Sequence, residues 1–136
     1  MDSTPSLVII EDHEPDFILY SHVIKDAGKK LELIWISNGQ EAVDFFQDAV
    51  RTQQAMPSLI LLDLNLPSYS GHELLRFFKK DPGLQGIPIV ILSSSGLGGE
   101  ESQVLSQGAE AFIQKPLELD KLSEELNRVI DHWIPN

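Results

Sequence analysis

The chain has 136 residues, no cysteine and a formal net charge of −11, a size that accommodates one domain with one hydrophobic core. Without cysteine there is neither a disulfide framework nor a thiolate metal site, and a cytoplasmic location is expected. The acidic balance and the lack of a Lys/Arg cluster argue against nucleic-acid binding. The apolar runs are too short to cross a membrane, so the expected partners are other proteins.

Five short apolar runs alternate along the chain with five stretches in which apolar residues recur at helical spacing. Unbroken apolar runs rich in β-branched residues are typical of strands buried on both faces of a parallel sheet. In chain order the expected elements are a strand over Leu7–Ile10, a helix on Phe17, Tyr20, Ile24 and Ala27, a strand over Leu31–Ile36, a helix on Ala42, Phe45, Phe46 and Ala49, a strand over Leu59–Leu62, a helix on Leu74, Leu75 and Phe78, a strand over Ile89–Leu92, a short helix on Val104 and Leu105, a strand over Ala111–Ile113, and a helix on Leu122, Leu126, Val129 and Trp133.

Two of these helices have clear end signals, because Pro82 disfavours helix at the residue before it and Gly108 is a good residue just past a helix end. A strand–helix unit repeated five times predicts a doubly wound (βα)5 fold of the α/β class. Its five-stranded parallel sheet has right-handed crossovers and helices on both faces. No linker or repeat interrupts the pattern, so residues 1–136 are expected to form one domain without an effector domain.

Polar side chains gather where the strands end. The first strand runs into Glu11 and Asp12, the third into Asp63, the fourth into Ser93, and the fifth into Lys115. Because ligands of open α/β sheets bind outside the carboxyl ends of the strands, we expect these side chains to share one rim.

Each of these residues alone has an ordinary structural explanation, such as a helix cap, a loop serine or a solvated lysine. Together, three crowded carboxylates repel one another and must either lose charge or gain a cation. A set of oxygen ligands at a strand-end rim suits Mg²⁺, which accepts one or two carboxylates together with water and phosphate oxygens. The sequence therefore predicts a Mg²⁺ site there.

The segments VIIEDHEPD, LILLDLNLPSYSG, IPIVILSSS and GAEAFIQKPLEL together resemble the receiver domain of two-component response regulators. The resemblance extends from Leu7 to the last helix. It implies a flavodoxin-like (CheY-like) sheet with strand order 2-1-3-4-5, phosphoryl transfer from a histidine kinase, and Mg²⁺ as the cofactor. It also implies that the chain is no enzyme beyond its own phosphotransfer and dephosphorylation, and that its signal passes to a downstream protein.

The same resemblance implies roles for individual residues. Asp63 matches the phosphoacceptor, with Lys115 and Ser93 beside it. Metal ligands are expected at Glu11 (through water), Asp12, Asp63 and the backbone carbonyl of Asn65. Ser93, Phe112 and Pro116 match the switch positions, with a cis bond expected between Lys115 and Pro116, and Gly71 matches the glycine of the loop after the phosphoacceptor.

Within the family the chain is similar to single-domain regulators that partner phytochrome-type histidine kinases. This similarity rests on Asp16 in an EDxxxD arrangement, the LDLNLP segment, the stretch over residues 51–58 and the aromatic helix end at Trp133.

The glycine-rich segment over residues 95–99 indicates the moving part, because three glycines in five residues give little rigidity. A hydroxyl at Ser93 that bonds to phosphate would pull this segment and let Phe112 swing inward. The alternative reading of Phe112 is an ordinary core phenylalanine.

Two other classes of protein share parts of this pattern. A haloacid-dehalogenase-type phosphatase needs an acid two residues after its nucleophile, where Asn65 stands and cannot protonate a leaving group. A phosphorylation-independent pseudo-receiver, a pure interaction module, usually lacks Asp63, the acidic pair or Lys115. No nucleotide-binding motif occurs, so no further cofactor is expected.

The output surface is expected over the fourth helix, fifth strand and fifth helix. Leu97, Trp133 and Ile134 would be exposed there and would favour a protein partner or a homodimer. The alternative is that Trp133 merely closes the bottom of the core.

Overall fold

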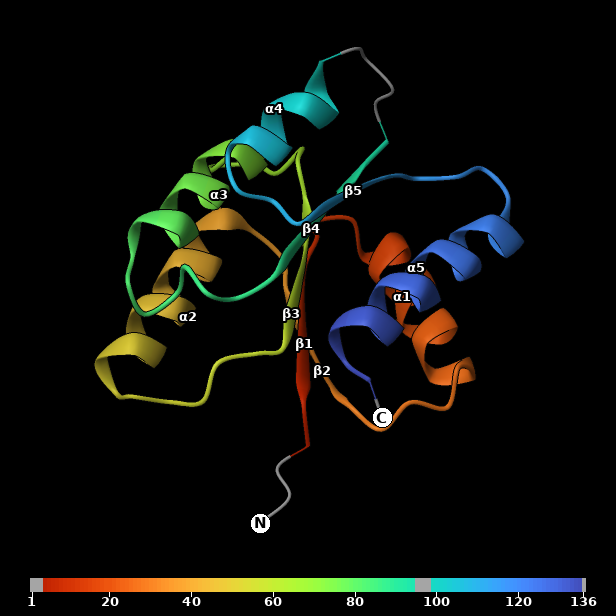
Figure 1. Ribbon diagram of the computed structural model, residues 1–136, viewed down its shortest axis with the longest axis horizontal. Helices are drawn as coiled ribbons and strands as arrows, with labels where there is room; N and C mark the ends of the chain where they lie inside the picture. The colour runs from red at the N-terminus through yellow and green to blue at the C-terminus, as the bar shows by residue number, and fades with distance from the viewer. Residues whose placement is uncertain (1–3, 95–98, 136) are drawn as a thin grey trace.

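The computed structural model describes residues 4–94 and 99–135. Its centre is a parallel sheet in the order β2-β1-β3-β4-β5, which confirms the predicted fold class and strand order (Figure 1). The strands are β1 (Ser6–Ile10), β2 (Glu32–Ile36), β3 (Leu59–Asp63), β4 (Ile89–Ser93) and β5 (Ala111–Gln114).

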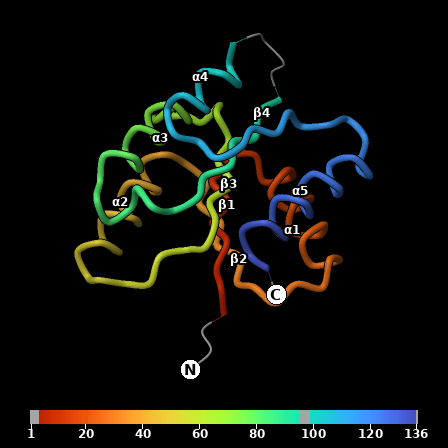
Figure 2. Tube along the Cα trace, viewed as in Figure 1, coloured from red at the N-terminus to blue at the C-terminus, as the bar shows by residue number. Residues whose placement is uncertain are grey.

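In the described part of the chain, five helices cover the two faces of this sheet (Figures 1 and 2). Helices α2 (Gly39–Arg51), α3 (Gly71–Lys80) and α4 (Glu100–Ser106) lie on one face, and α1 (Glu14–Asp26) and α5 (Leu119–Trp133) lie on the other. Alternate residues of each strand point to opposite faces, so Val8 and Ile10 join the core under α2–α4 while Leu7 and Ile9 join the core under α1 and α5. This arrangement is why the central strands are apolar without alternation.

The strands β3 and β4 extend one residue beyond the apolar runs of the sequence. Asp63 is the last residue of β3 and pairs in register with Leu92, and Ser93 is the last residue of β4 and pairs with Gln114. Both polar residues are therefore held by the ladder of the sheet itself, and not by a loop.

The start of α3 packs closely against the end of β3. The hydroxyl of Ser70 accepts a hydrogen bond from the backbone N–H of Glu73, and the Glu73 carboxylate accepts one from the backbone N–H of Ser70, which makes a capping box. Gly71 donates its N–H to the carbonyl of Leu64, and an added Cβ would lie 2.5 Å from the Cα of that leucine. Only glycine permits so close an approach.

Near the C-terminus the structure differs from one reading of the sequence. Ile134 is buried and Trp133 is half-buried against the core under α1 and α5, so Trp133 does help to close the core there and Ile134 contributes no exposed surface. Leu97 lies outside the described residues. Among the residues that the structure describes, no helix combines the length and apolarity needed to span a bilayer.

Candidate functional site

Three carboxylates meet at the carboxyl ends of β1 and β3. Glu11, Asp12 and Asp63 each offer an oxygen within 4.8 Å of the other two. Glu11 and Asp63 are buried and Asp12 is exposed. The structure thus brings together the three acidic residues that the sequence placed at one rim.

The backbone around Glu11 is fixed from several sides. Its N–H donates to the carbonyl of Ile36, and its own carbonyl accepts a hydrogen bond of 2.7 Å from Nε1 of Trp35. The Trp35 ring in turn stacks on Phe17 of α1, with ring centroids 4.7 Å apart. These contacts hold the turn from β1 into α1 in place and aim the Glu11 side chain into the site.

Lys115 is the counter-charge of the cluster. Its Nζ lies 3.1 Å from Oε1 of Glu11, 3.5 Å from Oδ2 of Asp16 and 3.9 Å from Oδ1 of Asp63. The Lys115 side chain is only 15% exposed, and its backbone N–H donates to the carbonyl of Ser93. The ammonium therefore lies among the carboxylates of Glu11, Asp16 and Asp63.

Burial and neighbouring charge displace the proton affinities of this group. Burial, and next the charge of Asp63, raises the pKa of Glu11 from an ordinary value of 4.5 to about 7, although Lys115 opposes the shift. Burial works against the charge of Lys115, but Tyr20, Asp63 and Glu11 together raise its pKa above the usual range. Burial also raises the pKa of Tyr20, whose ring centroid lies 5.9 Å from the Lys115 ammonium.

The raised pKa of Glu11 makes stability depend on pH. A carboxyl that binds its proton more tightly in the folded chain contributes stability that is complete below pH 4.5 and is lost as pH rises toward 7. In metal-free protein we expect the free energy of unfolding of Glu11→Gln, relative to wild type, to rise by about 1–3 kcal/mol across that window. Urea denaturation at several pH values measures the free energy of unfolding of both proteins. A difference between them that does not change with pH would contradict the prediction.

The other predicted site residues lie around the cluster in different ways. Asn65 is exposed, and its backbone N–H donates to Oδ1 of Asp63 over 3.2 Å. Ser93 is buried, and its hydroxyl donates to Oε1 of Glu100 over 2.8 Å. Phe112 lies on β5, half-buried against the core under α2–α4.

The cis bond expected between Lys115 and Pro116 is wrong. No cis peptide bond occurs among the described residues. Trans is the intrinsically favoured form of a bond before proline, by about 0.5–1 kcal/mol, and Lys115 reaches Glu11 and Asp63 from the trans form. Of the predicted moving segment over residues 95–99, residues 95–98 lie outside the described part of the chain.

Sequence reasoning missed two neighbours of the site. Tyr20 was assigned only to the buried face of a helix, although it follows Asp16 by four residues and so lies on the same helix face beside Lys115. The second is Glu100, the first residue of α4, whose carboxylate accepts a hydrogen bond from the Ser93 hydroxyl. The only signal for it in the sequence is that it follows Ser93 by 7 residues.

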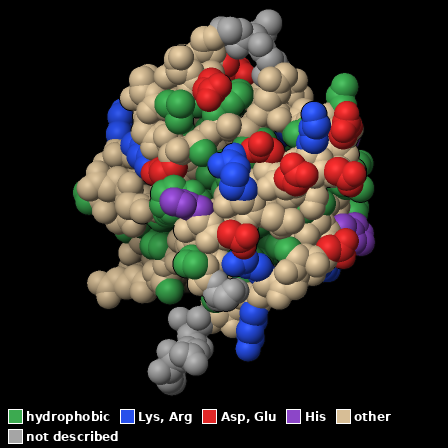
Figure 3. Space-filling view, turned by 45° about the vertical axis from the view of Figure 1, so that its right-hand side comes forward, with side chains coloured by type: hydrophobic (Ala, Val, Ile, Leu, Met, Phe, Trp, Pro, Cys, Tyr) green, Lys and Arg blue, Asp and Glu red, His purple; other side chains and the backbone are tan. Residues whose placement is uncertain are grey.

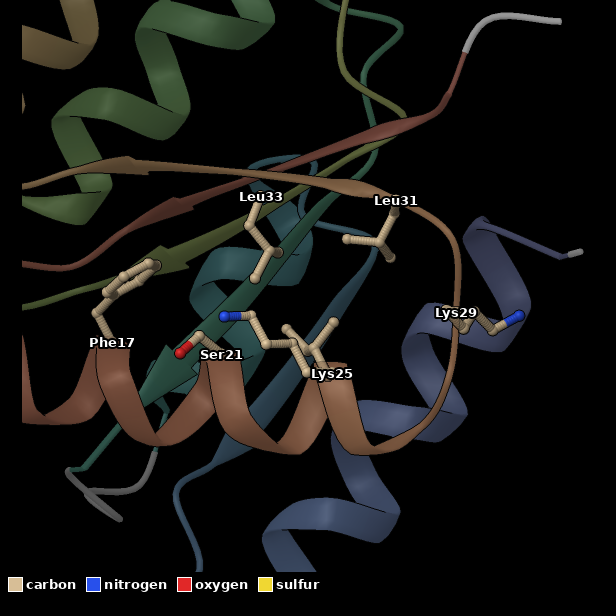
Figure 4. Close-up of a pocket in the computed structure, with 7 residues that line it drawn as sticks. Phe17, Ser21, Lys25, Lys29, Leu31 and Leu33 are labelled. Carbon is tan, nitrogen blue, oxygen red and sulfur yellow. The ribbon is translucent and has the colours of Figure 1, made fainter.

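Outside the acidic cluster, the described residues line several surface hollows. One hollow of about 390 Å³ is a groove between α1 and β2 (Figure 4), and none of the three clustered acids lines it. Its walls include Phe17, Leu31 and Leu33, and the nearby Lys29 is paired with Asp131. On the face shown in Figure 3, Lys and Arg side chains are scattered among acidic ones.

Comparison with known proteins gives consistent matches over nearly the whole chain. A family model described as the response regulator receiver domain matches residues 7–127. The polar-differentiation response regulator DivK of Brucella anthropi is 32% identical over 121 residues, which cover 89% of this chain and 92% of DivK.

Two solved structures are also closely similar. The Mn²⁺-bound form of response regulator Rcp1 has a TM-score of 0.86 and 28% identity, with 97% of this chain and 96% of that chain covered. The phosphorylated cyanobacterial phytochrome response regulator RcpA has a TM-score of 0.88 and 27% identity, with 98% and 96% covered.

Proposed function

The chain belongs to the response regulator receiver domain family, and on that premise we propose that Asp63 accepts a phosphoryl group from a sensor histidine kinase in a site that binds Mg²⁺. Receiver domains act in two-component signalling and are in general signalling modules, not enzymes. The main support for this proposal is the position of Asp63. Its carboxylate is buried at the end of the central strand β3, among two further carboxylates and one ammonium.

The donor set fits a hard divalent cation. All three side chains offer oxygen, their ligand atoms lie within 4.8 Å of one another, and the exposed Asp12 leaves room for water, which Mg²⁺ retains in most protein sites. Asp12 and Asp63 would ligate the ion directly, Glu11 through a water molecule, and Asn65 through its carbonyl. When bound, Mg²⁺ supplies positive charge that offsets the charge of the phosphoryl oxygens.

The proposed transfer joins a carboxylate oxygen of Asp63 to phosphorus. The phosphorus–nitrogen bond of a phosphohistidine breaks, and the imidazole keeps the bonding electron pair and takes up a proton from water. Lys115, whose high pKa keeps it charged, neutralises one phosphoryl oxygen, and Ser93 donates its hydroxyl to another. Hydrolysis of the resulting acyl phosphate would be the only other reaction of the chain.

The surface that transmits the signal is proposed to be the face formed by α4, β5 and α5. Phe112 and Pro116 line a groove of about 310 Å³ there, together with Lys121 of α5. An inward turn of Phe112 would change the shape of this groove, and packed side chains favour two discrete states over a continuum. We therefore assign Phe112 and Pro116 as switch residues and this face as the site of the downstream protein.

Two further partners remain proposals. A phytochrome-type kinase is proposed because the chain is similar in fold and sequence to RcpA, itself a phytochrome response regulator. Association as a homodimer is an alternative use of the face at α4, where Leu105 is exposed. No observation favours the pseudo-receiver reading, because Asp63, the acidic pair and Lys115 lie together.

The affinity for Mg²⁺ should fall when a proposed metal ligand is removed and should change little when the switch residue Ser93 is altered. Asp12→Ala removes a direct ligand, and we expect it to weaken Mg²⁺ binding by at least about tenfold, because the loss of even an outer-shell partner of a metal ligand typically costs about 10–100-fold in affinity. Ser93→Ala should leave binding within about twofold, because its hydroxyl is engaged with Glu100. Titration calorimetry measures both, and loss of binding in Ser93→Ala would contradict the assigned geometry.

The function itself is tested by phosphotransfer from a panel of purified, phosphorylated histidine kinases in the presence of Mg²⁺. We expect transfer from at least one kinase, with phytochrome-type kinases the fastest, and loss of transfer when the metal is chelated. Failure of every kinase to transfer would contradict the proposal.

A further inference from the structure

We propose that Glu100 is a positioning residue that holds the Ser93 hydroxyl in the unphosphorylated protein, so that phosphorylation of Asp63 must break the Ser93–Glu100 hydrogen bond and release the first turn of α4. The inference rests on the proposed function and adds to it that the Ser93 hydroxyl is hydrogen-bonded to α4 in the unphosphorylated protein.

The geometry of the hydrogen bond is well defined. The hydroxyl of Ser93 donates to Oε1 of Glu100 over 2.8 Å. Ser93 is completely buried, and its backbone is held by pairing with Gln114 and by the N–H of Lys115. Glu100 is half-buried and is the first residue of α4. The bond therefore joins the rigid end of a core strand to the start of a short surface helix.

The chemistry of a hydroxyl makes the two states exclusive. A serine hydroxyl has a single hydrogen to donate, so Ser93 cannot donate to Glu100 and to a phosphoryl oxygen on Asp63 at the same time. Once the hydroxyl turns to the phosphoryl group, the half-buried Glu100 carboxylate loses this donor. A charge in that position favours water over burial, which draws the first turn of α4 outward.

The coupling also works in reverse. A partner that draws the Glu100 carboxylate away from Ser93 would free the Ser93 hydroxyl and so favour the phosphorylated state. By linkage, phosphorylation would strengthen the binding of that partner by the same factor.

The test compares two neighbouring acids of the first turn of α4. Glu100→Ala removes the acceptor of Ser93, whereas Glu101→Ala removes the same charge from the same turn without touching that bond. The probe is beryllofluoride, a phosphoryl analogue, with Mg²⁺. We expect Glu100→Ala to bind it about tenfold more tightly than wild type, which is 1.4 kcal/mol, and Glu101→Ala within about twofold. Equal binding by the two variants, or weaker binding by Glu100→Ala, would overturn the proposal.

A second measurement tests the hydrogen bond without the proposed function. In a double-mutant cycle of urea unfolding, without metal or phosphate, Ser93→Ala and Glu100→Ala should be coupled by about fivefold or more in the unfolding equilibrium. Additive effects would overturn the inference. If wild type and all variants fail to bind beryllofluoride, the proposed function fails and the switching role falls with it, while the cycle still reports on the bond.

Discussion

Gly71→Ala is expected to lower the free energy of unfolding by about 3 kcal/mol, as overpacking of a tight contact does. An added Cβ would lie 2.5 Å from the Cα of Leu64 and 2.8 Å from the carbonyl oxygen of Asp63. Both are backbone atoms, so a rotamer change cannot relieve the clash. The start of α3 must move away from the end of β3, and the turn after Asp63, which carries Asn65, must move with it.

The matched control is Gly86→Ala, because a Cβ at Gly86 would meet no atom within 4 Å. Its free energy of unfolding should stay within about 1 kcal/mol of wild type. Urea denaturation followed by circular dichroism measures both variants. Equal stability of the two would show that α3 does not pack on β3 as closely as described.

Asp63→Asn is expected to abolish phosphoryl uptake while the protein stays folded. An amide oxygen is too weak a nucleophile to form the acyl phosphate, whereas the shape of the side chain is nearly unchanged. Burial is the largest cause of the raised pKa of Glu11, and the substitution removes the second, the charge of Asp63, so Glu11 should titrate at lower pH. The measurement is transfer of labelled phosphate from a kinase that phosphorylates wild type, together with thermal unfolding.

Asp16→Asn is the control for this prediction. The Asp16 carboxylate lies 3.5 Å from the Lys115 ammonium, so the substitution removes a negative charge from the same ammonium. Asp16 belongs to α1, however, and not to the end of β3. It should still accept phosphate. If Asp63→Asn were still labelled, or if Asp16→Asn alone lost its label, the assignment of the phosphoryl group to Asp63 would be wrong.

The fold and the acidic cluster could be predicted because both follow from local pattern. The unbroken run over Leu59–Leu62 requires a strand covered on both faces, and the next residue is then Asp63 at the carboxyl end of a parallel sheet. Glu11 follows β1 in the same way, so topology alone brings the two carboxylates together.

What pattern could not supply is contact between elements. Helical spacing identifies Tyr20 as buried, but not that its ring lies beside Lys115. The position of Glu100 depends on how the chain returns from β4 into α4, which no periodicity reports. The isomer before Pro116 was expected from a family resemblance, and the trans bond in the structure corrects it.

Direct location of the phosphoryl group tests the central claim most sharply. Wild-type protein is phosphorylated by a histidine kinase with Mg²⁺ and treated with borohydride, which reduces an aspartyl phosphate to homoserine. Its peptides are then sequenced by mass spectrometry. The proposed function predicts homoserine at Asp63 and at no other aspartate. Homoserine at Asp12 or another position instead, or its absence from protein that carries phosphate, would contradict it.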